Sequence, residues 1–530
     1  SVTPDDDPLT SEGIFVFNNT LPDVDDVDLG DLVSVVGQAG ENQGQTQITA
    51  FDIRVDATGQ SVTPTEITLP WESPDAPEAY EGMLVTVTNT LYVTEYFQTA
   101  RFAEIVTSTV DHLPQPTAVV EPGTDAIEMQ AANDLTKLVL DDGLNNQNPD
   151  PLRMHVNGEL ISAGNPLRGG DTIENATGVL TYTWAGNSSS GNKWRLRPTS
   201  TEATPAFDFT TANPRPDGPP DVGSDLTVAG FNVLNYFVTV GSGPNCGTDG
   251  TPADERNCRG ASNPAEYERQ HEKLIAALVD IDADIYGFAE LENTTGVDPL
   301  APIIADLNDA AGADVWESAY DGTIGDDVIK VGVIYRTDVV ELVGTPAILD
   351  ASFDPDFDTT LHRPSLAASF EELASGEQFT VVVNHWKSKG SCPGSGDDAD
   401  QGDGASCWNA ARTRAAEVML DWVATAPTGI DDDDVLVFGD LNSYAMEDPI
   451  RTLIDAGWVD VVQTFNPGAH SYVFDGQWGT LDYALASPSL AAQVSGADDY
   501  HINADELPLM DYNLDFQSPG QAALWYAPDR

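Results

Sequence analysis

Several polar residues stand near the ends of predicted strands, where their side chains could act together on one substrate. In chain order they are Asn232, Glu290, Asn384 with His385, Asp440 with Asn442, and Asp482. Each adjoins a short apolar run, and we expect each to lie at the carboxyl end of its strand. A single polar strand end indicates little. If the strands lie side by side, however, their ends converge, and the sequence predicts one pocket rich in oxygen ligands.

Oxygen ligands of this kind suit a hard cation. Carboxylate and amide oxygens favour Mg²⁺, Mn²⁺ or Ca²⁺, and the sequence shows no local Cys/His cluster that would favour zinc. A cation held by one or two carboxylates keeps positions open for phosphate oxygens and water. The residues therefore predict metal-assisted chemistry on a phosphate ester, with Mg²⁺ or Mn²⁺ at the reacting centre.

A second group of residues could contact the phosphate itself. His385 shares a loop with Asn384, Lys387 and Lys389, and Arg363 precedes another predicted strand. His385 could donate a proton or a hydrogen bond to a phosphate oxygen, although a purely structural histidine is the alternative. In so acidic a chain, two lysines beside one histidine indicate an anion contact.

The elements that must position these residues begin after a Pro/Gly-rich linker at residues 211–225. Beyond it, buried-strand runs alternate with amphipathic helices, one of which begins at Asn263-Pro264 and another of which covers 410–422. Residues 226–530 are therefore predicted to form a layered α/β domain with two sheets. The runs read as strands are 226–232, 285–288, 328–335, 366–370, 379–383 and 435–438.

The residues before the linker predict β structure. Alternating segments such as 32–36, 47–55 and 83–87 are separated by Gly, Pro, Asn and Asp. Two small barrels of the oligonucleotide/oligosaccharide-binding (OB) type would account for them, one over residues 1–115 and one over 116–210. We expect no membrane span, because no apolar run approaches the roughly 20 residues that a span requires.

The charge of the chain is extreme. Its 87 acidic and 22 basic residues give a formal net charge of −65. Such an imbalance destabilises a compact state by self-repulsion, which concentrated salt screens. The composition thus indicates a salty environment. It also excludes long-range attraction of nucleic acid, so a nucleic acid substrate would have to be held by local contacts.

Four cysteines form two close pairs, Cys246 with Cys258 and Cys392 with Cys407. Local disulfides are the simplest connectivity, and neither spacing fits a structural zinc site well. Disulfides indicate an oxidising, extracellular or cell-surface location, and we interpret the polar first residues as a mature N-terminus left by processing. The acidic run 397–403 inside the second loop could bind Ca²⁺, with solvated surface acid as the alternative.

A set of motifs gives the sequence a specific resemblance. In order they are FNVLNYF, DIYGFAELEN, HRPSLAASF, VNHWKSKG, GDLNSY, TLDYALA and HINADE, with EGMLV and LRGGD upstream. The set resembles the endonuclease/exonuclease/phosphatase superfamily, and more closely the secreted bacterial and archaeal nucleases that carry OB-like domains before a hydrolase similar to pancreatic deoxyribonuclease. The resemblance implies a four-layer α/β sandwich and in-line attack of water on a phosphodiester of DNA, with RNA possible as a substrate.

The resemblance also implies roles for single residues. Glu290 is the expected principal metal ligand, assisted by Asn232 and by Asp440. His385 is expected to contact the scissile phosphate, and Arg363 to bind it. The remaining implied roles are orientation of water by Asn442 with Asp440, orientation of a general base by Asp482, and substrate contacts by Asn384, Lys387 and Lys389.

The sequence departs from the superfamily pattern near its end. The superfamily closes with a Ser-Asp-His motif whose His is the general base, and no such motif occurs before Arg530. The domain thus lacks its expected last strand, and either the motif lies beyond Arg530 or another group is the base. His501 is the candidate, and Tyr483 stands where relatives often have His. The alternatives to a nuclease are a phosphatase or phospholipid phosphodiesterase on the same scaffold, and a non-catalytic surface protein.

Overall fold

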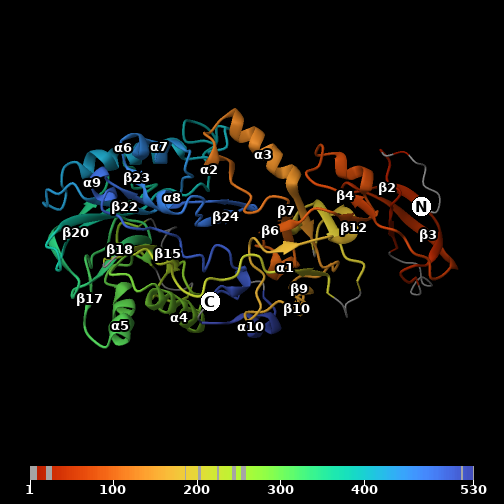
Figure 1. Cartoon of the computed structure of the whole chain (residues 1–530), viewed down its shortest axis with the longest axis horizontal. Coiled ribbons are helices and arrows are strands. Elements are labelled where there is room, and N and C mark those ends of the chain that lie inside the picture. The colour runs from red at the N-terminus through yellow and green to blue at the C-terminus, as the bar shows by residue number, and fades with distance from the viewer. Residues whose placement is uncertain are drawn as a thin grey trace.

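The computed structural model describes residues 7, 9–18, 27–185, 187–200, 205–223, 226–241, 246–251, 258–514 and 517–528. The molecule is elongated (Figure 1), with residues 226–514 forming most of one half and the N-terminal strands forming the other. The described residues include no helix that is long and apolar enough to cross a membrane.

The C-terminal half contains two sheets. The first has the order β15-β16-β18-β17, and the second has the order β19-β20-β21-β22-β26-β23. The strands of the first are β15 (Val228–Tyr236), β16 (Ile285–Glu292), β17 (Trp316–Ser318) and β18 (Ile329–Arg336). Those of the second are β19 (Val340–Leu349), β20 (Arg363–Glu372), β21 (Gln378–His385), β22 (Val435–Asp440), β23 (Val459–Asp460) and β26 (Asp482–Ala486).

Helices cover the outer face of each sheet. The first sheet packs on α4 (Pro264–Ile281) and α5 (Leu300–Ala311), and the second packs on α6 (Asn409–Val423) and α7 (Asp448–Asp455). The predicted start of α4 is confirmed, because the Asn263 side chain accepts a hydrogen bond from the backbone N–H of Glu266 at 3.1 Å. Short helices α8 (Val461–Phe465) and α9 (Pro488–Ala491) flank the second sheet.

The two sheets face each other across an apolar core. Phe438 of β22 reaches the first sheet at Gly230 and Gly287, and a Cβ at Gly287 would lie 2.3 Å from its ring. Glycine is therefore required at 287 if the sheets are to approach this closely. Helix, sheet, sheet and helix form the four layers that the sequence predicts for this part of the chain.

The N-terminal half contains an eight-stranded open sheet of order β11-β6-β7-β8-β13-β12-β5-β4. The prediction of two closed barrels is not borne out, because the sheets in this region are open. β7 and β8 are antiparallel neighbours, so strands from both sides of residue 115 share one sheet and one core. The strands are β4 (Thr65–Ile67), β5 (Leu84–Val87), β6 (Leu91–Glu95), β7 (Ile105–Ser108), β8 (Lys137–Leu140), β11 (Thr172–Ile173), β12 (Thr177–Thr183) and β13 (Lys193–Arg197).

Smaller elements complete this half. A long hairpin lies near the N-terminal end of the molecule, and helix α3 runs along the top of the view in Figure 1 toward the C-terminal half. The remaining strands are β1 (Phe15–Phe17), β2 (Leu32–Asn42), β3 (Gln45–Ala57), β9 (Met154–Val156), β10 (Glu159–Leu160) and β14 (Phe207–Phe209). The helices are α1 (Thr99–Phe102), α2 (Pro116–Val119), α3 (Thr124–Thr136) and three-residue to five-residue 3₁₀ turns at Ala76–Tyr80 and Ser188–Ser190.

The two halves are joined by more than the linker. The hairpin of β24 (Tyr472–Phe474) and β25 (Gln477–Gly479) inserts Trp478 into the core of the N-terminal sheet. The segment after residue 500 adds Leu507, Leu509 and Trp525 to that same core, through the 3₁₀ turn Pro508–Met510 and helix α10 (Pro519–Trp525). The halves therefore share one continuous apolar core at their contact.

Candidate active site

Four of the predicted site residues lie side by side on neighbouring strands of the second sheet. Arg363 is in register with His385, His385 with Asp440, and Asp440 with Asp482. The expectation that Asp482 ends a strand was wrong, because Asp482 begins β26, whereas Arg363 begins β20 at the start of the strand it was expected to precede. These strands run antiparallel to their neighbours, so their first residues reach the edge at which β21 and β22 finish.

Glu290 and Asn232 come from the first sheet and face this row. The Asn232 amide donates from Nδ2 to Glu290 Oε1 at 3.3 Å and to Asp440 Oδ2 at 3.2 Å, so it bridges the two sheets. Glu290 has φ +66° where the pairing of β16 with β18 changes register. A left-handed conformation is costly for glutamate, and such strain persists where the surroundings fix a functional side chain.

The carboxylates are buried together. Burial, reinforced by the Asp482 charge, raises the pKa of Asp440 well above its ordinary value. Burial and the Glu290 charge raise the pKa of Asp482 to about 6. Opposing carboxylates are mutually destabilising. The carboxylate oxygens of Glu290 and Asp440 and their negative charge fit a divalent cation, while Asn232 turns its Nδ2 toward both and its Oδ1 accepts from the backbone N–H of Leu234.

The His385 ring lies close to the carboxylates of Asp440 and Glu290. Its Nε2 lies 3.7 Å from Asp440 Oδ2 and 3.9 Å from Glu290 Oε1, while its buried Nδ1 has no hydrogen-bond partner. Burial, with the nearby charge of Arg363, lowers the pKa of His385 well below its ordinary value. The ring is therefore neutral, and it retains an N–H that can donate to a ligand.

Arg363 is held by a second acid. Its Nε lies 3.1 Å from Asp327 Oδ2, and Arg259 lies 3.6 Å from the other oxygen of the same carboxylate. Both guanidinium groups act on His385, because their charges help to lower its pKa. Arg363 thus lies beside the predicted phosphate position, and Asp327 fixes its orientation.

Asn442 supports the site from the turn after β22. It has φ +49°, which asparagine tolerates better than most residues, and its backbone N–H donates to Asp440 Oδ1 at 2.9 Å. Its side chain donates to the carbonyl of Trp386 at 3.0 Å, on the loop that follows His385. Asn442 therefore ties the Asp440 carboxylate to the His385 loop.

Two residues predicted to contact the substrate, Asn384 and Lys387, form hydrogen bonds within the protein instead. Asn384 is fully buried, where it accepts from Ser365 Oγ at 2.6 Å and donates to the carbonyl of Val382 at 3.0 Å. Lys387 donates to the carbonyls of Ser388 and Gly390, both at 3.0 Å. These contacts assign Asn384 to the support of the strand and Lys387 to the shape of its own loop.

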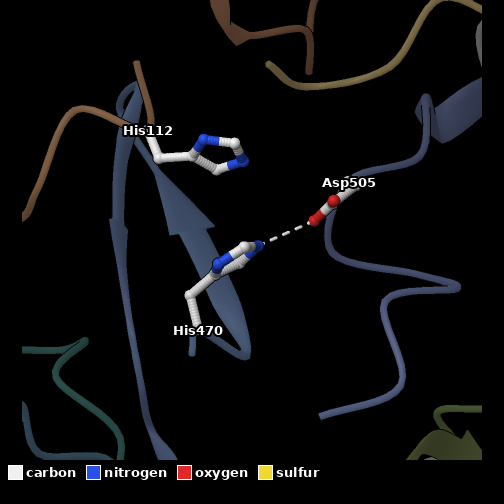
Figure 2. A group of neighbouring side chains, drawn as sticks. All are labelled: His112, His470 and Asp505. Atoms are coloured by element: carbon white, nitrogen blue, oxygen red, sulfur yellow. Dashed lines mark hydrogen bonds and ion pairs between the residues drawn. The ribbon is translucent and has the colours of Figure 1, made fainter. Parts of the chain in front are cut away.

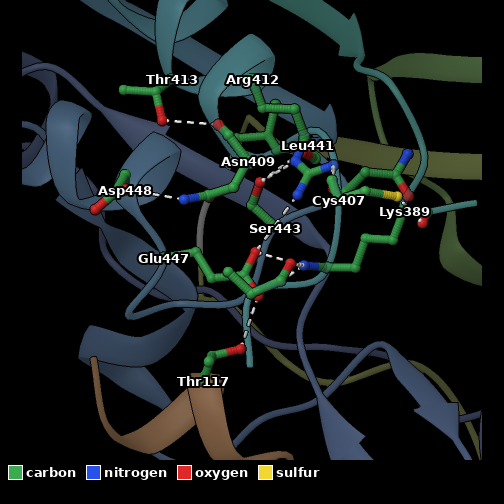
Figure 3. Close-up of polar contacts among 12 residues, drawn as sticks. Thr117, Lys389, Cys407, Asn409, Arg412, Thr413, Leu441, Ser443, Glu447 and Asp448 are labelled. Atoms are coloured by element: carbon green, nitrogen blue, oxygen red, sulfur yellow. Dashed lines mark hydrogen bonds and ion pairs between the residues drawn. The ribbon is translucent and has the colours of Figure 1, made fainter. Parts of the chain in front are cut away.

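Lys389 lies in a buried charge cluster that it forms with Glu447, Arg412 and Thr117 (Figure 3). Its ammonium donates to both Glu447 oxygens at 2.6 Å and to the carbonyl of Ala405 at 2.8 Å. Arg412 lies 3.8 Å from Glu447 Oε2, and Thr117 of the N-terminal half donates to Glu447 Oε1 at 2.7 Å. All three N–H donors of Lys389 are used, so its contacts support a structural role rather than the predicted substrate contact.

The candidate base lies beside His470, and the residue after His470 contacts Asp482. The His501 ring stacks on His470, with 4.3 Å between ring centroids. Ser471 Oγ accepts from the backbone N–H of Asp482 at 3.2 Å, which fixes this segment beside β26. Tyr483, at the position where relatives often have His, donates its hydroxyl inside the fold to the carbonyls of Ser443 and Thr480. Tyr483 is thus a packing residue here.

These residues open onto one cavity of about 1450 Å³. Its described walls include most of the predicted site, whereas Arg363, Lys387 and Asn384 are not among the described lining residues. The predicted residues that line it are Asn232, Glu290, His385, Lys389, Asp440, Asn442, Asp482 and His501. Gln115 and Gln130 of the N-terminal half also line it, so the cavity extends between the halves.

Both predicted disulfides are confirmed, Cys246 with Cys258 and Cys392 with Cys407. The calcium prediction gains no support in the second loop, where the carboxylates take separate partners. Asp398 pairs with Arg414 at 3.1 Å, and Asp400 and Asp403 accept from backbone N–H groups of the loop. Across the described residues, this loop contributes to no compact group of metal ligands.

Several residues of the site carried no readable signal in the sequence. Arg259 and Asp327 reach Arg363 from distant loops, and only the Cys246–Cys258 pair hinted that the first loop is anchored. Asp499 lines the cavity wall, where burial and the Asp482 charge raise its pKa to about 7. Such residues are adjacent in space alone, so spacing along the chain cannot reveal them.

No curated protein matches the chain. Similar solved structures include an endonuclease/exonuclease/phosphatase family protein from Bacteroides thetaiotaomicron, with 17% identity and a TM-score of 0.32, covering 50% of this chain and 83% of that one. Others are the human Nocturnin catalytic domain with bound sulfate (15% identity, TM-score 0.32, 50% and 83% covered) and D. rerio TDP2 complexed with a single-strand DNA product (17% identity, TM-score 0.30, 49% and 83% covered).

The sequence model of one family matches residues 231–503, which is more than half of the chain. The match contains the strands that carry Asn232, Glu290, His385, Asp440 and Asp482, and it extends past His501. This match, which agrees with the four-layer fold, shows that the chain belongs to the endonuclease/exonuclease/phosphatase family.

Proposed function

We propose that this protein is a divalent-metal-dependent nuclease that hydrolyses phosphodiester bonds of DNA, with RNA as a further substrate. The observation that carries the proposal is the cavity in which the carboxylates and His385 meet. At about 1450 Å³ it exceeds the roughly 300–1,000 Å³ of a small-molecule site, so it has room for a polymer segment. Its extension toward the N-terminal half supports a substrate longer than a phosphate monoester.

The metal site would be formed by the carboxylates of Glu290 and Asp440, with Asn232 between them and Mg²⁺ or Mn²⁺ as the cation that suits oxygen ligands. A bound cation would neutralise charge on the phosphate and polarise its P–O bond. The protein's own contribution is to hold the two carboxylates apart and oriented, through the Asn232 amide and the backbone N–H groups of Asn235 and Asn442. The site is thus organised before substrate arrives.

His385 would bind the scissile phosphate. A neutral imidazole donates one hydrogen bond to a non-bridging oxygen, and Arg363 and Arg259 add positive charge behind it. In a chain with a formal charge of −65, this local positive charge offsets the repulsion that a phosphate would otherwise meet. Asp440 and Asn442 then orient the attacking water on the opposite side.

The proton of that water needs an acceptor. We keep His501 as the proposed general base, because it lines the same cavity as Asp482 and lies inside the segment that matches the family. A His501→Ala variant that keeps full activity would exclude this role.

We further propose that the protein works outside the cell in salty surroundings. Two disulfides are typical of oxidising compartments, and the net charge of −65 suits a medium in which salt screens repulsion. Unfolding measured from low to molar KCl would test the second point, since we expect the melting temperature to rise steadily with salt.

The main test uses the full chain in molar KCl with plasmid DNA, RNA, and p-nitrophenyl phosphate as a monoester. We expect DNA cleavage with Mg²⁺ or Mn²⁺, loss of cleavage with EDTA, and at least about tenfold slower turnover of the monoester. Faster turnover of the monoester would assign the protein to the phosphatases. Intact DNA and RNA with every divalent cation would refute the proposal.

A further inference from the structure

Two histidines and one aspartate meet at the contact between the halves of the molecule. One ligand atom each of His112, His470 and Asp505 lies within 4.8 Å of the others. His470 Nε2 is 2.9 Å from Asp505 Oδ1, and Figure 2 shows the His112 ring facing the same space. Across the part of the chain that the structure describes, this is the compact group of ligating side chains that geometry identifies.

Each of these side chains except His470 is oriented by a partner behind it. His112 Nδ1 lies 2.6 Å from Asp111 Oδ1, which leaves Nε2 as its atom for the shared space. The second oxygen of Asp505 accepts from Asn213 Nδ2 at 2.7 Å and lies 3.3 Å from Arg168. Carboxylates behind ligating histidines, and donors behind ligating carboxylates, are the usual supports of metal ligands.

The backbone also fixes the distance between the three segments. Trp478 donates its backbone N–H to the carbonyl of Leu113 at 2.8 Å, and the backbone N–H of Gly169 donates to the carbonyl of Asp505 at 3.0 Å. These bonds hold the His112 segment and the Asp505 segment against the rest of the fold. The group is therefore set in place without help from a bound ligand.

Glycines of the LRGGD segment make room for the group. A Cβ at Gly169 would lie 2.3 Å from the Trp478 ring, and a Cβ at Gly170 would lie 2.9 Å from Cε1 of His112. Gly170 also has φ +86°, which favours glycine. Any larger residue would displace the aromatic and imidazole rings, so this segment is shaped to hold them.

We propose that His112, His470 and Asp505 bind one transition-metal ion of the zinc class. Two imidazoles and one carboxylate are a donor set that suits Zn²⁺ or Co²⁺ better than Mg²⁺, in contrast to the oxygen ligands of the active site. Water completes the coordination. The ion links the N-terminal half to the segment that carries the wall of the active-site cavity.

The experiment uses the full-length Glu290→Gln protein, so that the active-site cation does not contribute. After EDTA treatment, Zn²⁺ or Co²⁺ is added and excess metal is removed by gel filtration. We expect about one tightly held ion per chain, a rise of about 5 °C in melting temperature with Zn²⁺, and visible Co²⁺ absorption of a nitrogen-containing site. Mg²⁺ should give none of these effects.

Variants decide whether the ion lies at this site. His112→Ala and His470→Ala, each in the Glu290→Gln background, should lose the bound ion, the shift in melting temperature and the Co²⁺ spectrum. The matched control is His271→Ala, because His271 also pairs with one carboxylate, that of Asp306 at 2.8 Å, but lies outside the group.

A stoichiometry that is equal in the parent, His112→Ala and His271→Ala would overturn the proposal, as would absence of bound ion in the parent. The His112 side chain is about one-third exposed, so its replacement is compatible with a folded protein. Circular dichroism of each variant before metal addition confirms folding. Failure here leaves the proposed nuclease activity untouched, because that activity is measured with Glu290 intact.

Discussion

Two buried charge clusters lie next to each other in this protein and differ in balance. In the first, Glu290, Asp440 and Asp482 gather with a neutral His385 as their nearest ring. In the second, the single carboxylate of Glu447 meets the cations of Lys389 and Arg412. Both clusters are largely buried, and both include residues on or just after strands of the second sheet.

The difference shows that burial of charge does not by itself mark a functional site. In the Glu447 cluster the charges compensate one another, so the cluster is complete and its role is to hold loops in place. In the Glu290 cluster burial and the repulsion between carboxylates both disfavour the ionised forms, and the pKa values of Asp440 and Asp482 are raised. A cluster left unbalanced in the folded chain is the one that calls for a ligand.

The largest expected effect comes from removing a charge of the unbalanced cluster. Glu290→Gln should lower the rate of DNA hydrolysis by at least about 10³-fold, roughly 4 kcal/mol, because a lost cation forfeits its stabilisation of the transition state. Calorimetric titration should show Mn²⁺ affinity reduced in parallel. Hydrolysis within tenfold of the parent would mean that Glu290 does not hold the catalytic metal.

Glu292→Gln is the matched control for that change. Glu292 is buried on the same strand, but it accepts from the backbone N–H of Thr239 at 2.9 Å, which a glutamine oxygen can also do. Its Mn²⁺ affinity should stay within about twofold of the parent, because the residue faces another part of the fold. A loss equal to that of Glu290→Gln would point to a general defect of β16.

Removing the carboxylate of the balanced cluster should act on stability instead. Glu447→Gln leaves Lys389 and Arg412 buried without a counter-charge, and breaking such a pair costs about 3 kcal/mol or more. Urea unfolding followed by tryptophan fluorescence measures the change. The rate per folded molecule should change far less than in Glu290→Gln, since no atom of Glu447 belongs to the proposed metal site.

Glu417→Gln on α6 controls for charge removal as such. Glu417 is exposed, and an exposed substitution shifts the free energy of unfolding by about 0.5 kcal/mol or less. If Glu447→Gln were equally mild, the cluster would contribute little, and Lys389 would again be available to a substrate. In that case the contrast between the two clusters would fail.

The dependence of the free energy of unfolding on pH is a third test of the comparison between the two clusters. The pKa of Asp482 in the folded protein, about 6, lies above its unfolded value of about 3.9. Stability gained by protonating this buried group is present at pH 4 and is lost as the pH rises through about 6. In EDTA, Asp482→Asn should therefore stabilise the protein by about 2–3 kcal/mol at pH 7.5 and hardly at pH 4.

The measurement compares urea unfolding of the variant and parent at the two pH values in molar KCl. Asp431→Asn, an exposed carboxylate before the neighbouring strand β22, should show no such pH-dependent difference. Mn²⁺ at pH 7.5 should then stabilise the parent more than Asp482→Asn. Equal stabilisation at both pH values would show that Asp482 carries no cost of burial.

The two clusters also differ in how far the sequence predicts them. Glu290, His385 and Asp440 stand at the ends of recognisable strands, so the topology of the sheets brings them together. Lys389 lies two residues after Lys387 on the same loop. Its positive charge alone led to the prediction that it contacts an anionic substrate. Its partner, Glu447, comes 58 residues later in the sequence, after α6, and no pattern in the sequence predicts this contact.

The same distinction applies to the fold. Apolar runs predicted the main strands of the C-terminal half but not β17, β19 or β23. Burial on both faces of a strand leaves a signal in its own run of residues. The N-terminal strands were also recognised, but their closure into barrels depends on which edges pair. β7 and β8 pair across the predicted boundary at residue 115, and side chains such as Leu138 and Leu140 serve one shared core.

The smallest expected effect probes how the balanced cluster reaches the N-terminal half. Thr117 donates to Glu447 Oε1 at 2.7 Å, and Thr117→Val removes that bond while keeping the side-chain shape. A cost of about 1–2 kcal/mol is expected, because a bond to a charged acceptor is worth somewhat more than a neutral one. Thr413→Val is the matched control, since Thr413 donates to the carbonyl of Asn409 within its own helix. If both changes cost the same, the bond from Thr117 to Glu447 would contribute no more to the stability of the protein than an ordinary hydrogen bond within a helix.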